Sequence, residues 1–180
     1  VHLLGINDLH GQLDTVSTVS NKAAGTAPIL ATYLKNARAK YENSILFHNG
    51  DSVGASAPVS ALERDKPTLE WLNMMQFDVG SLGNHEFDQG IDALKAQLYG
   101  GKDPKNDKIV HSGVDFDYVN ANVIDNTTKK PLITPYVVKE VGGVKIGFIG
   151  TVTKATPSKV SPSGTAGVSF LSASEEVEAL

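Results

Sequence analysis

The chain has 180 residues, of which 41% are hydrophobic and 20% charged, the composition of an ordinary globular protein with room for one substantial core. Its formal net charge of -4 argues against a broad surface that tracks polynucleotide phosphates, and leaves a small phosphorylated substrate possible. Because the sequence contains no cysteine, disulfides, thiolate metal sites and cysteine nucleophiles are excluded. No apolar stretch approaches the ~20 residues of a membrane-spanning helix.

The first half of the chain alternates short apolar runs with segments of helical periodicity. We expect strands at 3–6, 45–47 and 79–82, and helices at 27–41, 67–75 and 88–99. Pro67 suits a first helical position, and Gly100-Gly101 should end the third helix. Such alternation predicts β-α-β units and a largely parallel sheet, in which ligands bind at the carboxyl ends of the strands.

The helix at 27–41 has a predicted buried face, and its basic residues lie elsewhere. The apolar residues at helical spacing are Ile29, Leu30, Tyr33, Leu34 and Ala37.

The second half of the chain has a different pattern of residues. Residues 102–108 are charged and turn-rich, whereas 118–124 and 136–141 have the pattern of strands. Gly142-Gly143 predicts a tight hairpin into a further strand at 144–149. A loop rich in Ser, Thr, Pro and Gly follows at 154–167. We expect a final helix through Glu175, Glu176 and Val177, capped by Ser172 or Ser174. With no internal repeat or linker, one domain is the interpretation.

Three polar signatures stand at the ends of apolar runs: Asn7-Asp8-Leu9-His10-Gly11, Gly50-Asp51-Ser52 and Gly83-Asn84-His85-Glu86. All three should therefore fall at one edge of the sheet. Asp, His and Asn supply the oxygen and imidazole ligands of borderline divalent metals. Two such ions about 3.5–4 Å apart can clamp a phosphoryl group, so the pattern predicts a metal-dependent phosphohydrolase.

Asp8 and His10 are two residues apart, and in extended backbone both would face one ion, with Gly11 letting the chain turn away. A turn with an Asx cap and a surface histidine explains the pair equally well. Asp51 has two carboxylate oxygens that could bridge two cations, although an Asp after a Gly is also an ordinary turn residue.

The third signature is harder to explain as a simple turn. Asn84 offers a neutral carbonyl ligand, His85 a group that titrates near neutrality, and Glu86 a carboxylate. Asp88, three residues after His85, could accept a hydrogen bond from the imidazole, fix its tautomer and raise its pKa. Alternatively, or in addition, Asp88 caps the helix that follows.

The remaining histidines are interpreted as structural or superficial. His48 lies in a strand and His111 follows another, so both are expected to be structural, and His2 is expected at the terminal surface.

In this order, the three motifs resemble those of the calcineurin-like metallophosphoesterases: D-x-H, then G-D, then G-N-H-E or G-N-H-D. The finer resemblance is to the 5'-nucleotidase and 2',3'-cyclic-nucleotide phosphodiesterase branch, and it lies in residues 7–13, 83–90 and 145–153. The resemblance implies an α/β fold, a mixed-sheet αββα sandwich, with helices flanking two packed sheets.

The resemblance also implies a role for each matching residue. Asp8 and His10 would bind one divalent ion, Asp51 both, and Asn84 the second. The ions would be Mn, Zn, Fe or Co. His85, with Asp88 as its partner, would stabilise charge on the phosphoryl group or protonate the leaving oxygen.

The attacking group implied by the resemblance is a metal-bound hydroxide, so no protein nucleophile is required. The implied reaction is hydrolysis of nucleotide phosphate esters.

One departure from the family pattern concerns the later histidines that complete both metal shells in family members. After residue 111 this chain has no histidine. We therefore expect residues 1–180 to be the N-terminal portion of one truncated catalytic domain, with a C-terminal part missing. Whether this portion alone is active is left open.

Several functions remain open within this interpretation. The substrate is expected to be a small nucleotide: a 5'-mononucleotide, a 2',3'-cyclic nucleotide or a nucleotide sugar. A non-catalytic binding or adhesion domain on the same fold is the competing hypothesis. The resemblance implies an extracellular, cell-wall-associated or periplasmic location. The chain shows no charged-then-apolar leader, so any leader is expected to have been removed or left out of this sequence.

Overall fold

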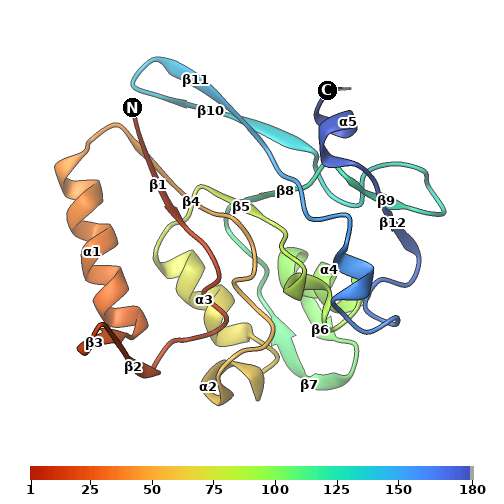
Figure 1. Cartoon of the computed structure of the whole chain (residues 1–180), viewed down its shortest axis with the longest axis horizontal. Coiled ribbons are helices and arrows are strands. Elements are labelled where there is room, and N and C mark those ends of the chain that lie inside the picture. The colour runs from red at the N-terminus through yellow and green to blue at the C-terminus, as the bar shows by residue number, and fades with distance from the viewer. Residues whose placement is uncertain (179–180) are drawn as a thin grey trace.

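A four-stranded parallel sheet forms the centre of the computed structural model, which describes residues 1–178 (Figure 1). Its strands, in spatial order, are β1 (His2–Ile6), β4 (Ser44–His48), β5 (Val79–Ser81) and β8 (Asp117–Val119). Ile6 pairs with His48, and His48 with Gly80. The strands β1, β4 and β5 therefore end at nearly the same level, and the α/β fold class is confirmed.

The other strands of residues 1–178 form four separate antiparallel pairs. The pairs are β2 (Val16–Val19) with β3 (Lys22–Gly25), β6 (Gly101–Asp103) with β7 (Asn106–His111), β9 (Val123–Asp125) with β12 (Val168–Phe170), and β10 (Tyr136–Val141) with β11 (Val144–Ile149). The hairpin expected at Gly142-Gly143 is thus confirmed. Of the two implied sheets, the described residues assemble the parallel one.

The part of the chain that the structure describes also contains five α-helices and two 3-10 turns. They are α1 (Ala27–Lys40), α2 (Pro58–Ala61), α3 (Lys66–Met74), α4 (Ile91–Tyr99), α5 (Ala173–Glu178), η1 (His85–Phe87) and η2 (Thr156–Ser158). Proline stands in the first turn of α1 and α3, where its missing N–H has no intrahelical partner to lose. None of the helices within residues 1–178 has both the length and the apolar character to cross a membrane.

Two apolar clusters hold these elements together. In the first, Leu34 of α1 and Leu72 of α3 pack with Leu46 of β4. In the second, Leu94 of α4 packs with Tyr118 of β8 and Phe170 of β12. Burial of such side chains stabilises the fold by about 1.5–3 kcal/mol each. Helices α1 and α3 therefore share one cluster with the sheet, and α4 belongs to the other.

The buried face of α1 is narrower than the sequence pattern predicts. Ala27 and Leu34 are buried, but Ile29 is 53% and Tyr33 71% exposed. Figure 1 shows the reason: α1 lies beside β1, the edge strand, so that only one stripe of the helix faces the sheet.

The helix predicted at 88–99 begins later, at Ile91. Residues 85–87 form η1 instead, and Gly90 at φ 95° is the N-cap. Asp88 is therefore outside the helix and does not cap it. The predicted end of the helix is confirmed, because Gly100 is the C-cap at φ 85°.

The strand predicted at 118–124 is in fact two strands, β8 and β9, which belong to different sheets. Two buried asparagines break it. Asn120 Oδ1 accepts the Val123 N–H at 3.0 Å, and Asn122 Nδ2 donates to the Val152 carbonyl at 2.7 Å. Hydrogen bonds of this kind, between a side chain and the backbone, compete with the hydrogen bonds that join neighbouring strands.

The segment predicted as turn-rich, 102–108, turns only at 104–105, and its flanks pair as β6 and β7. Asp103 Oδ1 accepts the N–H groups of Lys105 and Asn106 and so holds the turn. The pair β2–β3, the strand β12 and the helix α2 were not predicted. The expected loop at 154–167 is confirmed except for η2, and α5 follows directly after Ser172.

Candidate active site

Three loops lie at the carboxyl edge of the parallel sheet, where they follow β1, β4 and β5. The first two loops are bound to each other through their backbones. The N–H groups of Asp8, His10 and Gly11 donate to the carbonyls of Gly50, Asp51 and Ser52 at 3.0–3.2 Å. This ladder fixes the first signature against the second.

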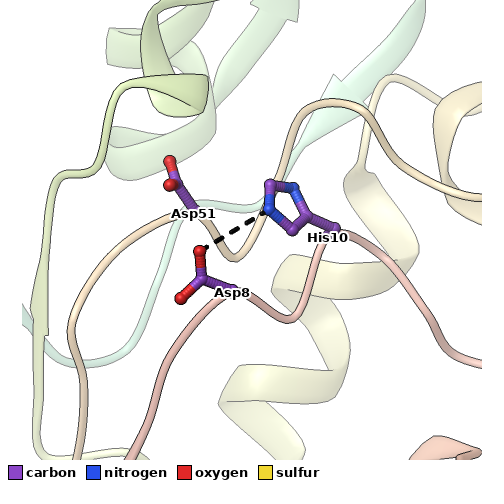
Figure 2. Close-up of side chains that lie close together, drawn as sticks. All are labelled: Asp8, His10 and Asp51. Carbon is purple, nitrogen blue, oxygen red and sulfur yellow. Dashed lines mark ion pairs between the residues drawn. The ribbon is translucent and has the colours of Figure 1, made fainter. Parts of the chain in front are cut away.

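Asp8, His10 and Asp51 lie together at this edge (Figure 2). Each offers one ligand atom, and these atoms lie within 4.8 Å of one another. The dashed line in Figure 2 marks the ion pair between His10 Nε2 and Asp8 Oδ1, which lie 3.8 Å apart. Two carboxylates and one imidazole form a donor set that suits a borderline divalent cation. The residues present therefore fit a metal ion.

The tautomer of His10 is set by the second loop. His10 Nδ1 lies 2.8 Å from the Gly54 carbonyl oxygen. Because a carbonyl can only accept, Nδ1 must carry the proton in this contact, which leaves Nε2 as the free lone pair. A histidine that binds a metal usually donates its other ring N–H in this way.

The backbone is left-handed at all three residues, whereas an extended backbone is the expectation for Asp8 and His10. The φ angles are 54° at Asp8, 47° at His10 and 51° at Asp51. Each costs roughly 1–2 kcal/mol for a residue with a side chain. Strain of this kind clusters at functional sites, where the surrounding structure enforces it.

His85 and Asp88 form the pair that the sequence spacing predicts. His85 Nδ1 lies 2.8 Å from Asp88 Oδ2, and the turn η1 supplies the geometry. Burial lowers the pKa of His85, but the hydrogen bond and charge of Asp88, with the charges of Asp51 and Glu86, outweigh it and raise the pKa. The His85 ring lies edge-on to His10, with centroids 4.9 Å apart, so the pair borders the candidate metal group.

Glu86 holds the second and third loops together, a role that sequence reasoning missed. It is 2% exposed. Its carboxylate accepts the N–H groups of Asp51, Ser52 and Gly83 at 2.6–2.9 Å. Burial raises the pKa of Glu86 to about 7, against the opposing effect of these hydrogen bonds. Only its place in the third signature pointed to Glu86.

Asn84 is half-buried and lies between two residues that touch Asp51. The N–H of His85 donates to Asp51 Oδ1 at 2.8 Å. On the other side, a Cβ added to Gly83 would lie 2.3 Å from the same oxygen. The backbone on both sides of Asn84, at Gly83 and His85, is thus packed against the Asp51 carboxylate.

A pocket adjoins the candidate metal group on the side of α1. Its volume is about 380 Å³, and its lining includes Asp8, Leu9, Leu30 and Tyr33. Asp8 therefore borders open, largely apolar space.

The other histidines match their interpretation as structural or superficial. His48 is 1% exposed, and its Nδ1 lies 3.0 Å from Ser52 Oγ. His111 is buried beside Asp103, whereas His2 is exposed and stacks on Tyr41.

The fold and the three loops can be compared with known protein families. Residues 1–161 match the family described as calcineurin-like phosphoesterase. The chain belongs to this family.

Three relatives show how varied the names within this family are. The chain is 38% identical to "Endonuclease YhcR" of Bacillus subtilis over 94% of its length. It is 40% identical to "Cell wall protein Lmo0130" of Listeria monocytogenes over 98%, and 33% identical to a "2',3'-cyclic-nucleotide 2'-phosphodiesterase/3'-nucleotidase" of Salmonella typhimurium over 84%. It spans only 14%, 25% and 24% of these proteins' lengths.

A solved structure shares the fold. The 5'-nucleotidase precursor of Thermus thermophilus superimposes with a TM-score of 0.76 over 98% of this chain and 33% of its own, at 25% identity. The expected resemblance to the nucleotidase branch is therefore confirmed.

Proposed function

We propose that this chain is the N-terminal portion of the catalytic domain of a nucleotide phosphohydrolase of the 5'-nucleotidase type. The observation that carries the proposal is that Asp8, His10 and Asp51 meet at one sheet edge, beside the ring of His85. Relatives named as a nucleotidase and a cyclic-nucleotide phosphodiesterase support the substrate class.

In this proposal, Asp8 and His10 would hold one divalent ion, Asp51 would contact both ions, and Asn84 would hold the second. When bound, the ions supply positive charge to the phosphoryl group and lower the pKa of water. A mixed shell of nitrogen and oxygen suits Mn, Zn, Fe or Co.

The contribution of the protein side chains is positioning and proton transfer. His85 stands beside the site with a raised pKa, so its protonated form can stabilise charge on the phosphoryl oxygens or protonate the leaving oxygen. Asp88 accepts the other ring N–H at 2.8 Å and so keeps the imidazole in one orientation.

The remaining metal ligands and the nucleoside-binding surface are proposed to come from sequence beyond residue 180. The relatives support this, since the chain matches only 14–25% of their lengths. An extracellular, cell-wall-associated or periplasmic location is proposed on the name of the Listeria relative.

Two alternatives have observations of their own. The Salmonella relative favours a 2',3'-cyclic nucleotide as substrate. The Bacillus relative is named an endonuclease, which makes a polynucleotide the second candidate substrate. The net charge of -4 argues against a polynucleotide. A nucleotide-sugar hydrolase or a non-catalytic adhesion domain remains a further outcome of the test.

The test is manganese-dependent phosphate release from AMP by residues 1–180 and by a longer chain that includes the sequence after residue 180. We expect release by the longer chain, and loss of release when Asp51 is changed to Asn. If the longer chain folds and binds manganese but cleaves only 2',3'-cyclic AMP, a nucleotide sugar or single-stranded DNA, the corresponding alternative replaces the proposal. If it cleaves none of them, the adhesion-domain hypothesis is favoured.

A further inference from the structure

Asp65 is a buried carboxylate that the proposed reaction does not use. It is 1% exposed and stands at the N-cap of α3 in a left-handed conformation, at φ 64°. An Asp at this position normally accepts an N–H of the first helical turn. Asp65 makes no such bond, so its carboxylate is free to serve another part of the molecule.

The carboxylate is bonded to the loops that follow β4 and β5. Asp65 Oδ2 accepts the Gly54 N–H at 3.2 Å and the Gln89 side-chain amide at 3.3 Å. Its second oxygen accepts the Ser60 hydroxyl at 2.9 Å, which in turn lies 2.6 Å from Thr68 Oγ1. One side chain thus spans two of the three loops of the candidate active site.

Two of these contacts, with Gly54 and Gln89, connect Asp65 to the histidines of the proposed function. Gly54 donates its N–H to Asp65 and presents its carbonyl, which belongs to the next peptide group, to His10 Nδ1 at 2.8 Å. Gln89 directly follows Asp88, the partner of His85. Asp65 is therefore linked to both histidines without touching either.

Gly54 is also in close contact with the His85–Asp88 pair. A Cβ at this residue would lie 2.6 Å from Asp88 Oδ2 and 2.8 Å from His85 Cβ. Gly54 is thus packed between His10 on one side and the His85–Asp88 pair on the other. A shift of this residue would move both.

We propose that Asp65 is a positioning residue. It fixes Gly54 and Gln89, and these two residues in turn set the ring orientations of His10 and His85. This inference deepens the proposed function and rests on its assignment of these two histidines. Outer carboxylates that orient metal-binding histidines change metal affinity or activity by about 10–100-fold when they are replaced.

The test compares variants of the intact protein. Asp65→Gly removes the carboxylate and suits the left-handed backbone. Asp65→Asn keeps one acceptor oxygen for the loops, and its amide can donate to Ser60, so it should restore most of the function. Thr68→Val is the matched control, because it removes one hydroxyl from the far end of the same cluster.

The readouts are manganese affinity by calorimetry and the ring nitrogen signals of 15N-labelled histidines in the metal-free protein. We expect Asp65→Gly to lower manganese affinity about 10–100-fold and to convert His10 from the single Nδ1-protonated tautomer to a mixture. Asp65→Asn and Thr68→Val should leave the tautomer unchanged. An Asp65→Gly protein with wild-type manganese affinity and an unchanged His10 tautomer would overturn the proposal.

A second variant covers the case in which Asp65→Gly does not fold. Gln89→Leu removes only one arm of the contact and should shift the His85 ring signals while leaving those of His10 in place. Unchanged His85 signals in that variant would count against the proposal. Since the ring signals do not depend on catalysis, a wild-type protein that releases no phosphate would contradict the proposed function but leave this test valid.

Discussion

The N–H of His85 donates a 2.8 Å hydrogen bond to Asp51 Oδ1. The residue proposed to contact both ions is thus tied directly to the loop that carries the proposed acid. Because Asp51 has a second carboxylate oxygen, this bond can hold the side chain in place while that oxygen remains available as a ligand.

Gly83 is expected to be essential to this contact. A Cβ at Gly83 would lie 2.3 Å from Asp51 Oδ1, so Gly83→Ala must displace the carboxylate. We expect manganese affinity, measured by calorimetry, to fall at least tenfold. The control is Gly147→Ala, where a Cβ meets nothing within 4 Å. Equal affinities of the two variants would contradict this account of the site.

Glu86→Gln should weaken the junction between the second and third loops. Glutamine keeps one acceptor oxygen but turns an amide N–H₂ toward backbone donors that now have no partner, which costs about 1–3 kcal/mol. Urea unfolding of the metal-free protein should show this loss. The exposed Glu63→Gln should unfold like the wild type. A Glu86→Gln protein as stable as the wild type would show that the three bonds are dispensable.

His85→Ala should lower kcat by about 10²–10⁴-fold, as loss of a general acid does, while the protein still binds manganese. Asp88→Asn should have a smaller effect in the same direction, since the imidazole keeps a hydrogen-bonding partner but loses a charged one. Asp92→Asn, on the exposed start of α4, is the control. Steady-state phosphate release measures all three. Unchanged turnover in His85→Ala would refute its assigned role.

The buried His48 predicts a dependence of stability on pH. Burial lowers the pKa of His48 from 6.5 to about 3. Between these values the unfolded state binds the proton and the folded state does not, so the free energy of unfolding rises with pH and the full contribution is present above pH 6.5.

The variant that tests this dependence is His48→Asn, which keeps a polar atom near Ser52. Its free energy of unfolding from urea titrations should lack up to ~1.4 kcal/mol per pH unit of the wild-type slope in this window. The exposed His2→Asn should retain the slope. A His48→Asn protein with the wild-type slope would place the titrating group elsewhere.

The sequence predicted the parts of the fold in which local patterns and packing agree. Apolar runs ending in polar signatures marked the ends of β1, β4 and β5, and the spacing of His85 and Asp88 predicted their contact. The turn η1 brings these two side chains together, although helix α4 begins only at Ile91. The pair β6–β7 was missed because residues 101–108 contain no apolar side chain that could alternate with the polar ones.

The rest of the site depends on contacts between residues far apart in the chain. Nothing in the neighbourhood of Asp65 indicates that its carboxylate reaches Gly54 and Gln89, and only the folded chain brings them together. Likewise, the left-handed backbone of Asp8 and His10 follows from the ladder with residues 50–52. Local pattern could predict the ligand types but not the conformation that directs them.

The most direct test of the central claim is the number of manganese ions bound by the intact protein, measured by calorimetry together with metal analysis. We predict two ions per chain in the wild type, and loss of tight binding at both positions in Asp51→Asn, because this carboxylate is proposed to contact both. Two tightly bound ions in the Asp51→Asn protein, or none in the wild type, would contradict a two-metal site built on these loops.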